Sequence, residues 1–201
     1  MESEFVIDNN NDTLIVCFGG FASEFGGILP FEFLNFFSKN FPNIDKYFYK
    51  DKKQMCYHCG ISNITNNIDE TVSYLDNKIK KYKKVIFTGN SAGAYAAILF
   101  GSLLKIPLVI TFNSITILYG RKHIYNPLYV NLSENVINDT TQYHLFTDTN
   151  IVNIKDNHHI YQSMNISKYP NVNITKKKGI DLKQMKISGE LYNIYNEIIN
   201  G

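Results

Sequence analysis

Short apolar runs alternate with longer amphipathic stretches along most of the chain. Residues 13–18, 107–112 and 143–147 are nearly continuous runs of β-branched, aromatic and leucine side chains, a pattern typical of strands buried on both faces. Residues 68–79 instead carry apolar side chains at helical spacing, with acidic residues in the first turn. The pattern predicts strands at 4–8, 13–18, 46–49, 85–88, 107–112, 143–147 and 172–175, and helices at 31–41, 68–79, 94–104, 156–167 and 187–198.

Strands that alternate with helices indicate a parallel sheet whose two faces are covered by helices. We therefore predict an α/β protein, built as a three-layer α/β/α sandwich around a mostly parallel sheet. A length of 201 residues suits one sizeable core, so residues 1–201 are expected to form a single domain. Residues 115–138 show weak periodicity, which predicts an irregular excursion over the sheet that forms a short lid.

The composition argues against several classes of function. The net charge is only +2 and 44% of the residues are hydrophobic, so no nucleic-acid partner is expected. The chain starts with acidic residues and no apolar run reaches membrane-spanning length, so we expect neither a secretory signal nor a membrane span. Three cysteines, an odd number, favour a reduced protein in the cytoplasm. Cys56 and Cys59 form one C-x-x-C pair, but a tetrahedral zinc site needs a second, so we expect no metal and no other cofactor.

A glycine-rich pentapeptide, G-N-S-A-G, joins a predicted strand to a predicted helix, with Ser91 at its centre. The spacing matches the G-x-S-x-G nucleophile elbow, in which a serine occupies a strained strand-to-helix turn and exposes its hydroxyl. Gly89 and Gly93 remove two side chains that would collide with the neighbouring strand or helix. The helix that follows directs free backbone N–H groups toward the serine, and that of Ala92 is a candidate oxyanion donor. The alternative is a turn that binds phosphate or only packs tightly.

With this elbow in place, the chain resembles the α/β-hydrolase superfamily. The order of predicted elements follows the superfamily over nearly the whole chain. The resemblance implies a second oxyanion donor after an early strand, where the backbone N–H of Gly20 or Phe21 falls. It also implies a catalytic acid after the strand two beyond the elbow strand, and Asp148 occupies that position. Taken alone, the glycine turn is equally compatible with an ordinary strand ending.

The chain departs from the superfamily at the catalytic histidine. That residue should follow the last strand, but the sequence there has Gly179 and Ile180, and no histidine occurs beyond His159. A serine hydroxyl needs a base to react at neutral pH. Two explanations remain open: a histidine from another segment acts as the base, or the base is lost and the fold serves as a binding scaffold. The earlier histidines are placed in loops or at the far end of a strand from the elbow: His58, His123 and His144.

The candidate bases are His158 and His159, which follow the acid strand in a predicted helix, with Asp148 or Asp156 to orient them. Adjacent residues project about 100° apart on a helix, so only one of the two can face the serine. We favour His159, because Asp156 and His159 match an Asp-x-x-His pattern in a group of compact hydrolase-like proteins that the chain resembles. Some members of that group are linked to polysaccharide biosynthesis. The same resemblance rests on an earlier cluster: Asp51, Tyr57 and His58.

These observations predict an esterase-like serine hydrolase that cleaves an ester or related acyl bond of a small molecule or glycan through an acyl-enzyme. The predicted catalytic residues are Ser91, Asp148 and His159, and the oxyanion donors are Gly20, Phe21 and Ala92. One alternative is a catalytically degenerate hydrolase fold used for binding. Another is an acyltransferase in polysaccharide metabolism, in which a sugar hydroxyl replaces water as the acyl acceptor. The sequence assigns no oligomeric state.

Overall fold

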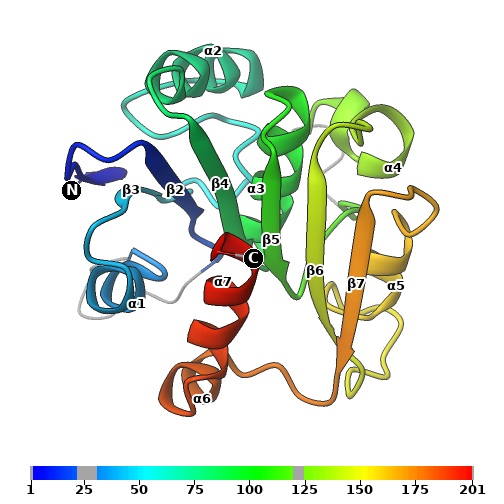
Figure 1. The fold of residues 1–201 in the computed structure, drawn as a ribbon. Coiled ribbons are helices and arrows are strands. Elements are labelled where there is room, and N and C mark those ends of the chain that lie inside the picture. The colour runs from blue at the N-terminus through cyan, green and yellow to red at the C-terminus, as the bar shows by residue number, and fades with distance from the viewer. Residues whose placement is uncertain (1, 22–30, 120–124, 201) are drawn as a thin grey trace.

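A seven-stranded sheet forms the centre of the molecule (Figure 1). The computed structural model describes residues 2–21, 31–119 and 125–200. The strands are β1 (Glu4–Ile7), β2 (Thr13–Phe18), β3 (Asp45–Tyr49), β4 (Lys84–Asn90), β5 (Leu108–Phe112), β6 (Gln142–Asp148) and β7 (Val172–Lys177). They lie in the order β1-β3-β2-β4-β5-β6-β7, with β1 antiparallel to β3 and the other neighbours parallel. The predicted mostly parallel sheet is therefore confirmed.

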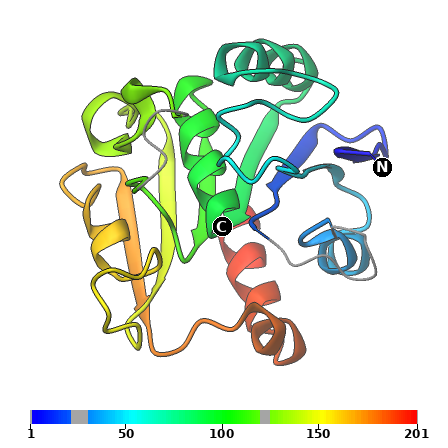
Figure 2. The same ribbon diagram turned by 180° about the vertical axis from the view of Figure 1, so that it is seen from behind.

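Helices cover both faces of this sheet. The face turned to the viewer in Figure 1 carries α1 (Leu34–Asn40), α6 (Leu182–Ile187) and α7 (Glu190–Asn200). The opposite face, which is in front in Figure 2, carries α2 (Ile68–Ile79), α3 (Ala92–Leu103), α4 (Leu132–Asn135) and α5 (Tyr161–Met164). The arrangement confirms the predicted three-layer α/β/α sandwich.

Two apolar clusters, one on each face, hold the layers together. On one face, the rings of Phe37 in α1 and Tyr195 in α7 pack edge to face with centroids 4.8 Å apart. On the other, Phe18 and Phe87 of neighbouring strands pack with Phe100 of α3. Residues 92–102 of α3 are all buried, so this helix is fixed on every side. Its first residue follows Ser91, and the core therefore immobilises the elbow.

Three predicted helices differ from those observed. The helix expected over 156–167 is reduced to the single turn of α5, because Asp156 and His159 take part in tight turns before it. The helix expected over 187–198 begins only at Glu190, as α7, and Ile187 is instead the last residue of a separate helix, α6; Gly189, with a φ of 80°, lies between them. The helix expected from residue 31 begins at Leu34.

The predicted excursion at 115–138 contains some regular structure. A short 3₁₀ helix, η1 (Pro127–Tyr129), precedes α4, and an isolated bridge pairs Ile117 with Asn131. Residues 120–124 lie outside the described part of the chain, and so does His123, one of the histidines that the sequence places in a loop. The lid function and the single-domain organisation remain predictions.

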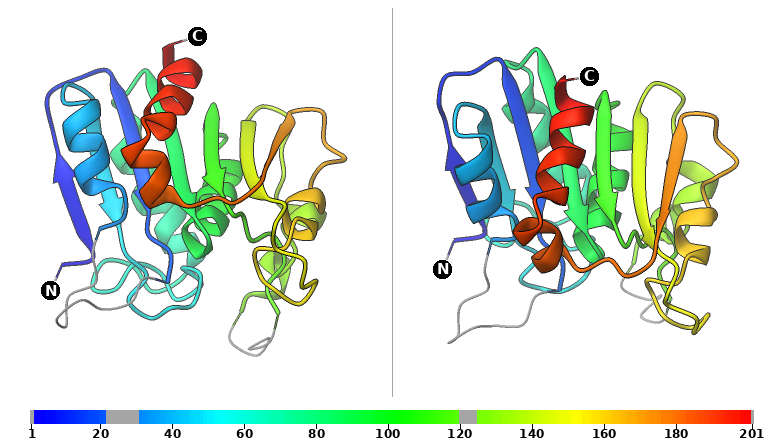
Figure 3. Two further views of the ribbon diagram at one scale, coloured as in Figure 1. Left: turned by 90° about the horizontal axis from the view of Figure 1, so that it is seen from below. Right: turned by 60° about the horizontal axis from the view of Figure 1, so that its bottom comes forward.

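The parallel strands bring several loops together at one edge of the sheet. Because β2, β4, β5, β6 and β7 run in the same direction, their carboxyl ends meet at the bottom of Figure 1, and Figure 3 turns this edge toward the viewer. The glycine turn after β2, the elbow after β4 and the loop after β6 all begin there.

Among the described residues, no helix combines the length and apolar character needed to cross a bilayer.

Candidate active site

Ser91 joins β4 to α3 in a backbone conformation that residues with a side chain rarely adopt. Its φ is 58° and its ψ is −122°. A Cβ on Gly89 would lie 2.2 Å from the carbonyl oxygen of Gly93, and a Cβ on Gly93 would lie 2.1 Å from that of Phe18. Both positions therefore require glycine. Strand, strained turn and helix together have the geometry of a nucleophile elbow.

The hydroxyl of Ser91 is paired with a histidine from the loop after β6. The distance from Ser91 Oγ to His158 Nε2 is 2.7 Å, which is a short hydrogen bond. On the other side of the ring, His158 Nδ1 lies 3.6 Å from a carboxylate oxygen of Asp156, an ion-pair separation rather than a hydrogen bond. The same oxygen accepts a hydrogen bond of 2.8 Å from the backbone N–H of His158. Serine, imidazole and carboxylate thus lie in the order that nucleophilic catalysis uses.

The structure brings His158 to Ser91 instead of the expected His159. The Nδ1 atom of His159 accepts a hydrogen bond of 3.1 Å from the backbone N–H of Tyr161, at the start of α5. The expectation failed because both histidines precede α5 in tight turns, where the 100° spacing of helical neighbours does not apply. The Asp-x-x-His pattern instead places Asp156 beside the neighbouring imidazole.

Asp148 lies at the carboxyl end of β6, as expected of a catalytic acid, but it contacts backbone. Its two oxygens accept hydrogen bonds of 2.8 Å from the N–H groups of Asn150, Gly179 and Ile180. Burial raises the pKa of Asp148, but these three donors outweigh burial and hold it below its usual value. The aspartate therefore fixes the turn that follows β7, where the superfamily histidine would stand.

The glycine turn after β2 packs directly against the elbow. A Cβ on Gly20 would lie 2.8 Å from the carbonyl oxygen of Asn90 and 3.5 Å from the Cβ of Ser91. The backbone N–H of Gly20, expected as an oxyanion donor, instead donates to Glu32 Oε2 at 2.9 Å. The other oxygen of Glu32 accepts a hydrogen bond of 3.2 Å from Asn90 Nδ2. Of the two donors predicted in this turn, the N–H of Phe21 is therefore the better candidate.

Sequence reasoning missed Glu32 and Asn90 as parts of the site. A signal was present for the first, because Glu32 is the one charged residue of a segment, 31–37, that contains four phenylalanines. Such a charge at the edge of an apolar stripe needs a hydrogen-bonding partner inside the fold. Burial raises the pKa of Glu32, although the bonds from Gly20 and Asn90 and the charge of Lys186 oppose this.

These groups enclose a small cavity. Its volume is about 280 Å³, close to the lower end of the range for ligand pockets. Half of the Phe21 side chain remains exposed at its edge. The cavity is lined by Gly20, Phe21, Glu32, Asn90, Ser91 and His158.

The cluster noted earlier in the sequence, Asp51, Tyr57 and His58, contacts the segments that carry the site. Asp51 Oδ2 accepts hydrogen bonds from the N–H groups of Met55 and Tyr57, which shapes the loop after β3. The Tyr57 hydroxyl lies 3.1 Å from the carbonyl oxygen of Gly19, in the glycine turn. His58 Nε2 lies 2.8 Å from the hydroxyl of Tyr95 on α3. The cluster therefore braces the glycine turn and the elbow helix, and places no group on Ser91.

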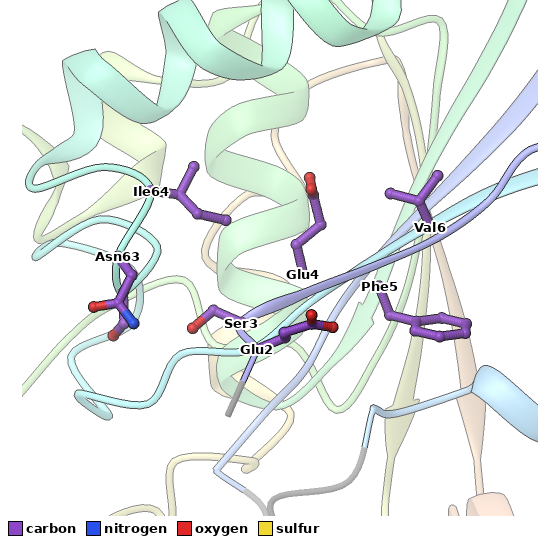
Figure 4. A pocket seen from close by; sticks show the side chains of 8 residues that line it. Glu2, Ser3, Glu4, Phe5, Val6, Asn63 and Ile64 are labelled. Atoms are coloured by element: carbon purple, nitrogen blue, oxygen red, sulfur yellow. The ribbon is translucent and has the colours of Figure 1, made fainter.

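A second cavity lies at the β1 edge of the sheet (Figure 4). Its volume is about 650 Å³, and Figure 4 shows Asn63 and Ile64 facing Ser3 and Glu4 across it. It is lined by Glu2, Ser3, Glu4, Phe5, Val6, Ser62, Asn63 and Ile64. These residues include no histidine, whereas the smaller cavity is lined by both Ser91 and His158, so the smaller cavity is the candidate active site. Among the described residues, no group of three or more His, Cys, Asp or Glu side chains is placed to hold a metal ion.

Solved structures with the same architecture give the class of fold. The capsule O-acetyltransferase of Neisseria meningitidis serogroup A superposes with a TM-score of 0.63 at 16% identity, over 94% of this chain and 88% of that one. An esterase from Pyrococcus furiosus gives a TM-score of 0.57 at 13% identity, over 94% and 82%. Mouse alpha/beta hydrolase domain-containing protein 10 gives 0.58 at 12%, over 98% and 93%. The chain therefore has an α/β-hydrolase-like fold.

Sequence comparison adds nothing to this assignment. No protein-family model matches the chain, and no curated protein matches it in sequence. At 16% identity or less, the structural similarity shows the fold alone.

Proposed function

We propose that the protein is a serine hydrolase that cleaves an ester or related acyl bond, with Ser91 as nucleophile and His158 as general base. The observation that carries the proposal is the 2.7 Å separation of Ser91 Oγ and His158 Nε2 at a strained elbow. Proximity of this kind is what a weakly acidic hydroxyl needs in order to attack a carbonyl at neutral pH.

The proposed reaction has an acylation stage and a deacylation stage. His158 Nε2 takes the Ser91 proton as Oγ bonds to the carbonyl carbon, and the oxyanion forms near the N–H groups of Phe21 and Ala92. The imidazolium then gives its proton to the departing alkoxide, which leaves an acyl-serine. Water loses a proton to His158 and attacks the acyl carbon, and the proton returns to Ser91 Oγ as the acid departs.

Asp156 interacts less closely with the histidine than the acid of a catalytic triad usually does. It lies 3.6 Å from His158 Nδ1, and its side chain is 42% exposed. Catalytic hydrogen bonds are often long without substrate and shorten in the complex. We therefore assign Asp156 the role of orienting the imidazole. Asp148, whose oxygens accept three backbone N–H groups, has a structural role in this proposal.

The cavity at Ser91, of about 280 Å³, is large enough for a small ester. An O-acyltransferase is the second candidate, because a capsule O-acetyltransferase is among the similar structures. The two candidates share every step up to the acyl-serine and differ in whether water or a sugar hydroxyl accepts the acyl group.

The proposal is tested with a fluorophosphonate probe and a small activated acetate ester. The probe should label the wild-type protein and leave Ser91→Ala unlabelled, and only the wild type should hydrolyse the ester. Absence of labelling, under conditions that label a known esterase, would favour a degenerate scaffold. Faster consumption of the ester when a sugar is added, with acylated sugar as product in place of the free acid, would favour the transferase.

A further inference from the structure

Glu32 connects two segments that would both supply oxyanion donors. Its Oε2 accepts the N–H of Gly20 at 2.9 Å, in the turn that contains Phe21. Its Oε1 accepts a hydrogen bond of 3.2 Å from Nδ2 of Asn90, the residue just before Ser91. One carboxylate therefore bridges the glycine turn and the elbow, within the cavity that contains the nucleophile.

We propose that Glu32 is a positioning residue for acyl transfer, which holds the glycine turn at a fixed distance from the elbow. The inference rests on the proposed function, because the two segments need a fixed separation only if they bind one oxyanion together. By occupying the Gly20 N–H, Glu32 also orients the next peptide group, which carries the N–H of Phe21. A donor displaced by about 1 Å can cost about 100-fold in rate.

The polar atoms around Glu32 allow the bridge to be tested by substitution. Asn90 Oδ1 is buried and has no hydrogen-bond partner among the described residues. In Glu32→Gln, the amide oxygen can still accept from Gly20, and its NH₂ group can donate to Asn90 Oδ1 once the Asn90 amide turns over. Glu32→Gln therefore keeps the bridge without the charge, whereas Glu32→Ala removes both.

The surroundings of Glu32 include further groups that titrate or carry charge. Lys186 on α6 attracts its carboxylate, and burial raises the pKa of Glu32. Within the described part of the chain, the other titratable groups close enough to interact with it or to share its cavity are Cys17, Tyr57, Tyr195 and His158. The glutamine variant separates the bridge from all of these charge effects, because it has no titrating group at position 32.

The experiment compares steady-state kinetics of Glu32→Ala, Glu32→Gln and wild type on a small activated acetate ester. Glu32→Ala should lower kcat by about 10- to 100-fold with little change in KM, and Glu32→Gln should stay within about threefold of wild type at neutral pH. Asn90→Ala, which removes only one of the two bonds, should give a smaller loss of kcat. Glu4→Ala is the matched control, because Glu4 also joins separate elements, through Tyr74 and Lys78, but lies away from Ser91.

A second measurement does not depend on activity. Amide exchange at Gly20, followed by NMR, should be slow in wild type and Glu32→Gln and at least tenfold faster in Glu32→Ala. Wild-type protein that is inert to the probe would refute the proposed function, and with it the catalytic meaning of the bridge. Reactive wild type with an equally reactive Glu32→Ala would overturn the positioning role alone. Equal losses in the alanine and glutamine variants would also overturn it, since the charge and not the bridge would then matter.

Discussion

The carboxylate of Asp148 accepts a hydrogen bond of 2.8 Å from the backbone N–H of Ile180, the residue that stands where the superfamily pattern has its histidine. The acid position and the histidine position are therefore still in contact, through a main-chain donor instead of an imidazole. Ser91 meanwhile pairs with His158, which comes from the opposite end of the loop that Asp148 begins. The acid and base roles of the proposed site are thus both supplied by the loop after β6.

Replacing Asp148 should affect stability more than catalysis. In Asp148→Asn, one carboxylate oxygen becomes an NH₂ group, which cannot accept a hydrogen bond from a backbone N–H. At least one of the three buried hydrogen bonds would therefore be lost. We expect a loss of about 1–3 kcal/mol in the free energy of unfolding, measured by urea denaturation. Activity per folded molecule should stay near that of wild type.

The matched variant is Asp156→Asn, which should affect catalysis more than stability. Asp156 is half-exposed, so its loss should change stability little, while the rate of ester hydrolysis falls by about tenfold or more as the imidazole loses its orienting charge. If Asp148→Asn instead removed activity at unchanged stability, Asp148 would be the catalytic acid and the present assignment would be wrong.

The two adjacent histidines should respond very differently to substitution. His158→Ala should lower kcat/KM for an activated ester by about 1,000-fold or more, because loss of the base leaves only the oxyanion donors and binding. His159→Ala should stay within about threefold of wild type, because the His159 ring accepts a hydrogen bond from the backbone N–H of Tyr161 and not from Ser91. The same kinetic assay checks both variants, and a large loss confined to His159→Ala would reverse the assignment.

The layers of the fold were predictable because the spacing of apolar residues along the chain reflects which side chains are buried. Residues 14–18 and 108–112 are buried on both faces, and the helix at 68–79 has one apolar face, so each sequence pattern matches the burial of its element. The elbow was predictable for a steric reason, since a Cβ at either flanking glycine would overlap backbone. Both features leave a pattern in the local sequence, although the contacts behind them are long-range.

The base was not predictable in the same way. Which of two adjacent histidines reaches Ser91 depends on turns before α5 that the sequence pattern describes as a helix. Glu32 was missed because its two partners, Gly20 and Asn90, are 12 and 58 residues away along the chain. Long-range polar contacts of this kind leave no periodic signal.

The glycine after the elbow should matter more for folding than the nucleophile does. In Gly93→Val, the new side chain would start from a Cβ that lies 2.1 Å from the Phe18 carbonyl oxygen, so strand and helix would have to separate. We expect Gly93→Val to lower the melting temperature by at least about 10 °C or to prevent folding. Ser91→Ala should change it by a few degrees at most. Equal melting temperatures for the two variants would contradict the elbow geometry.

His58 should make the fold sensitive to moderately acidic pH. Burial lowers the pKa of His58 to about 4, and its Nδ1 accepts the backbone N–H of Asn126 at 2.9 Å, which requires a neutral ring. The unfolded chain takes up the proton near pH 6.5, whereas the folded chain does so only near pH 4. The stabilising contribution is therefore complete above about pH 6.5 and declines as pH falls toward 4.

Urea denaturation at several pH values measures this effect. Between pH 6.5 and 4 the wild type should lose on the order of 3 kcal/mol in the free energy of unfolding through this group. His58→Gln should be less stable at neutral pH and should show a shallower decline. His159→Gln is the control, because His159 accepts an exposed backbone N–H, that of Tyr161, so this variant should keep most of the wild-type decline. A wild-type stability that is flat over this range would contradict the prediction.

A histidine placed at the superfamily position should not restore a base. Ile180 packs against the apolar cluster under α6 and α7, so its side chain is held on the face of the sheet opposite α3. In the double variant His158→Ala with Ile180→His, we expect ester hydrolysis to stay at the level of His158→Ala. Stability should also fall, because an imidazole would replace an apolar side chain in that cluster. Recovery of activity by tenfold or more would show that the turn can rotate toward Ser91, with Asp148 available to orient the new ring.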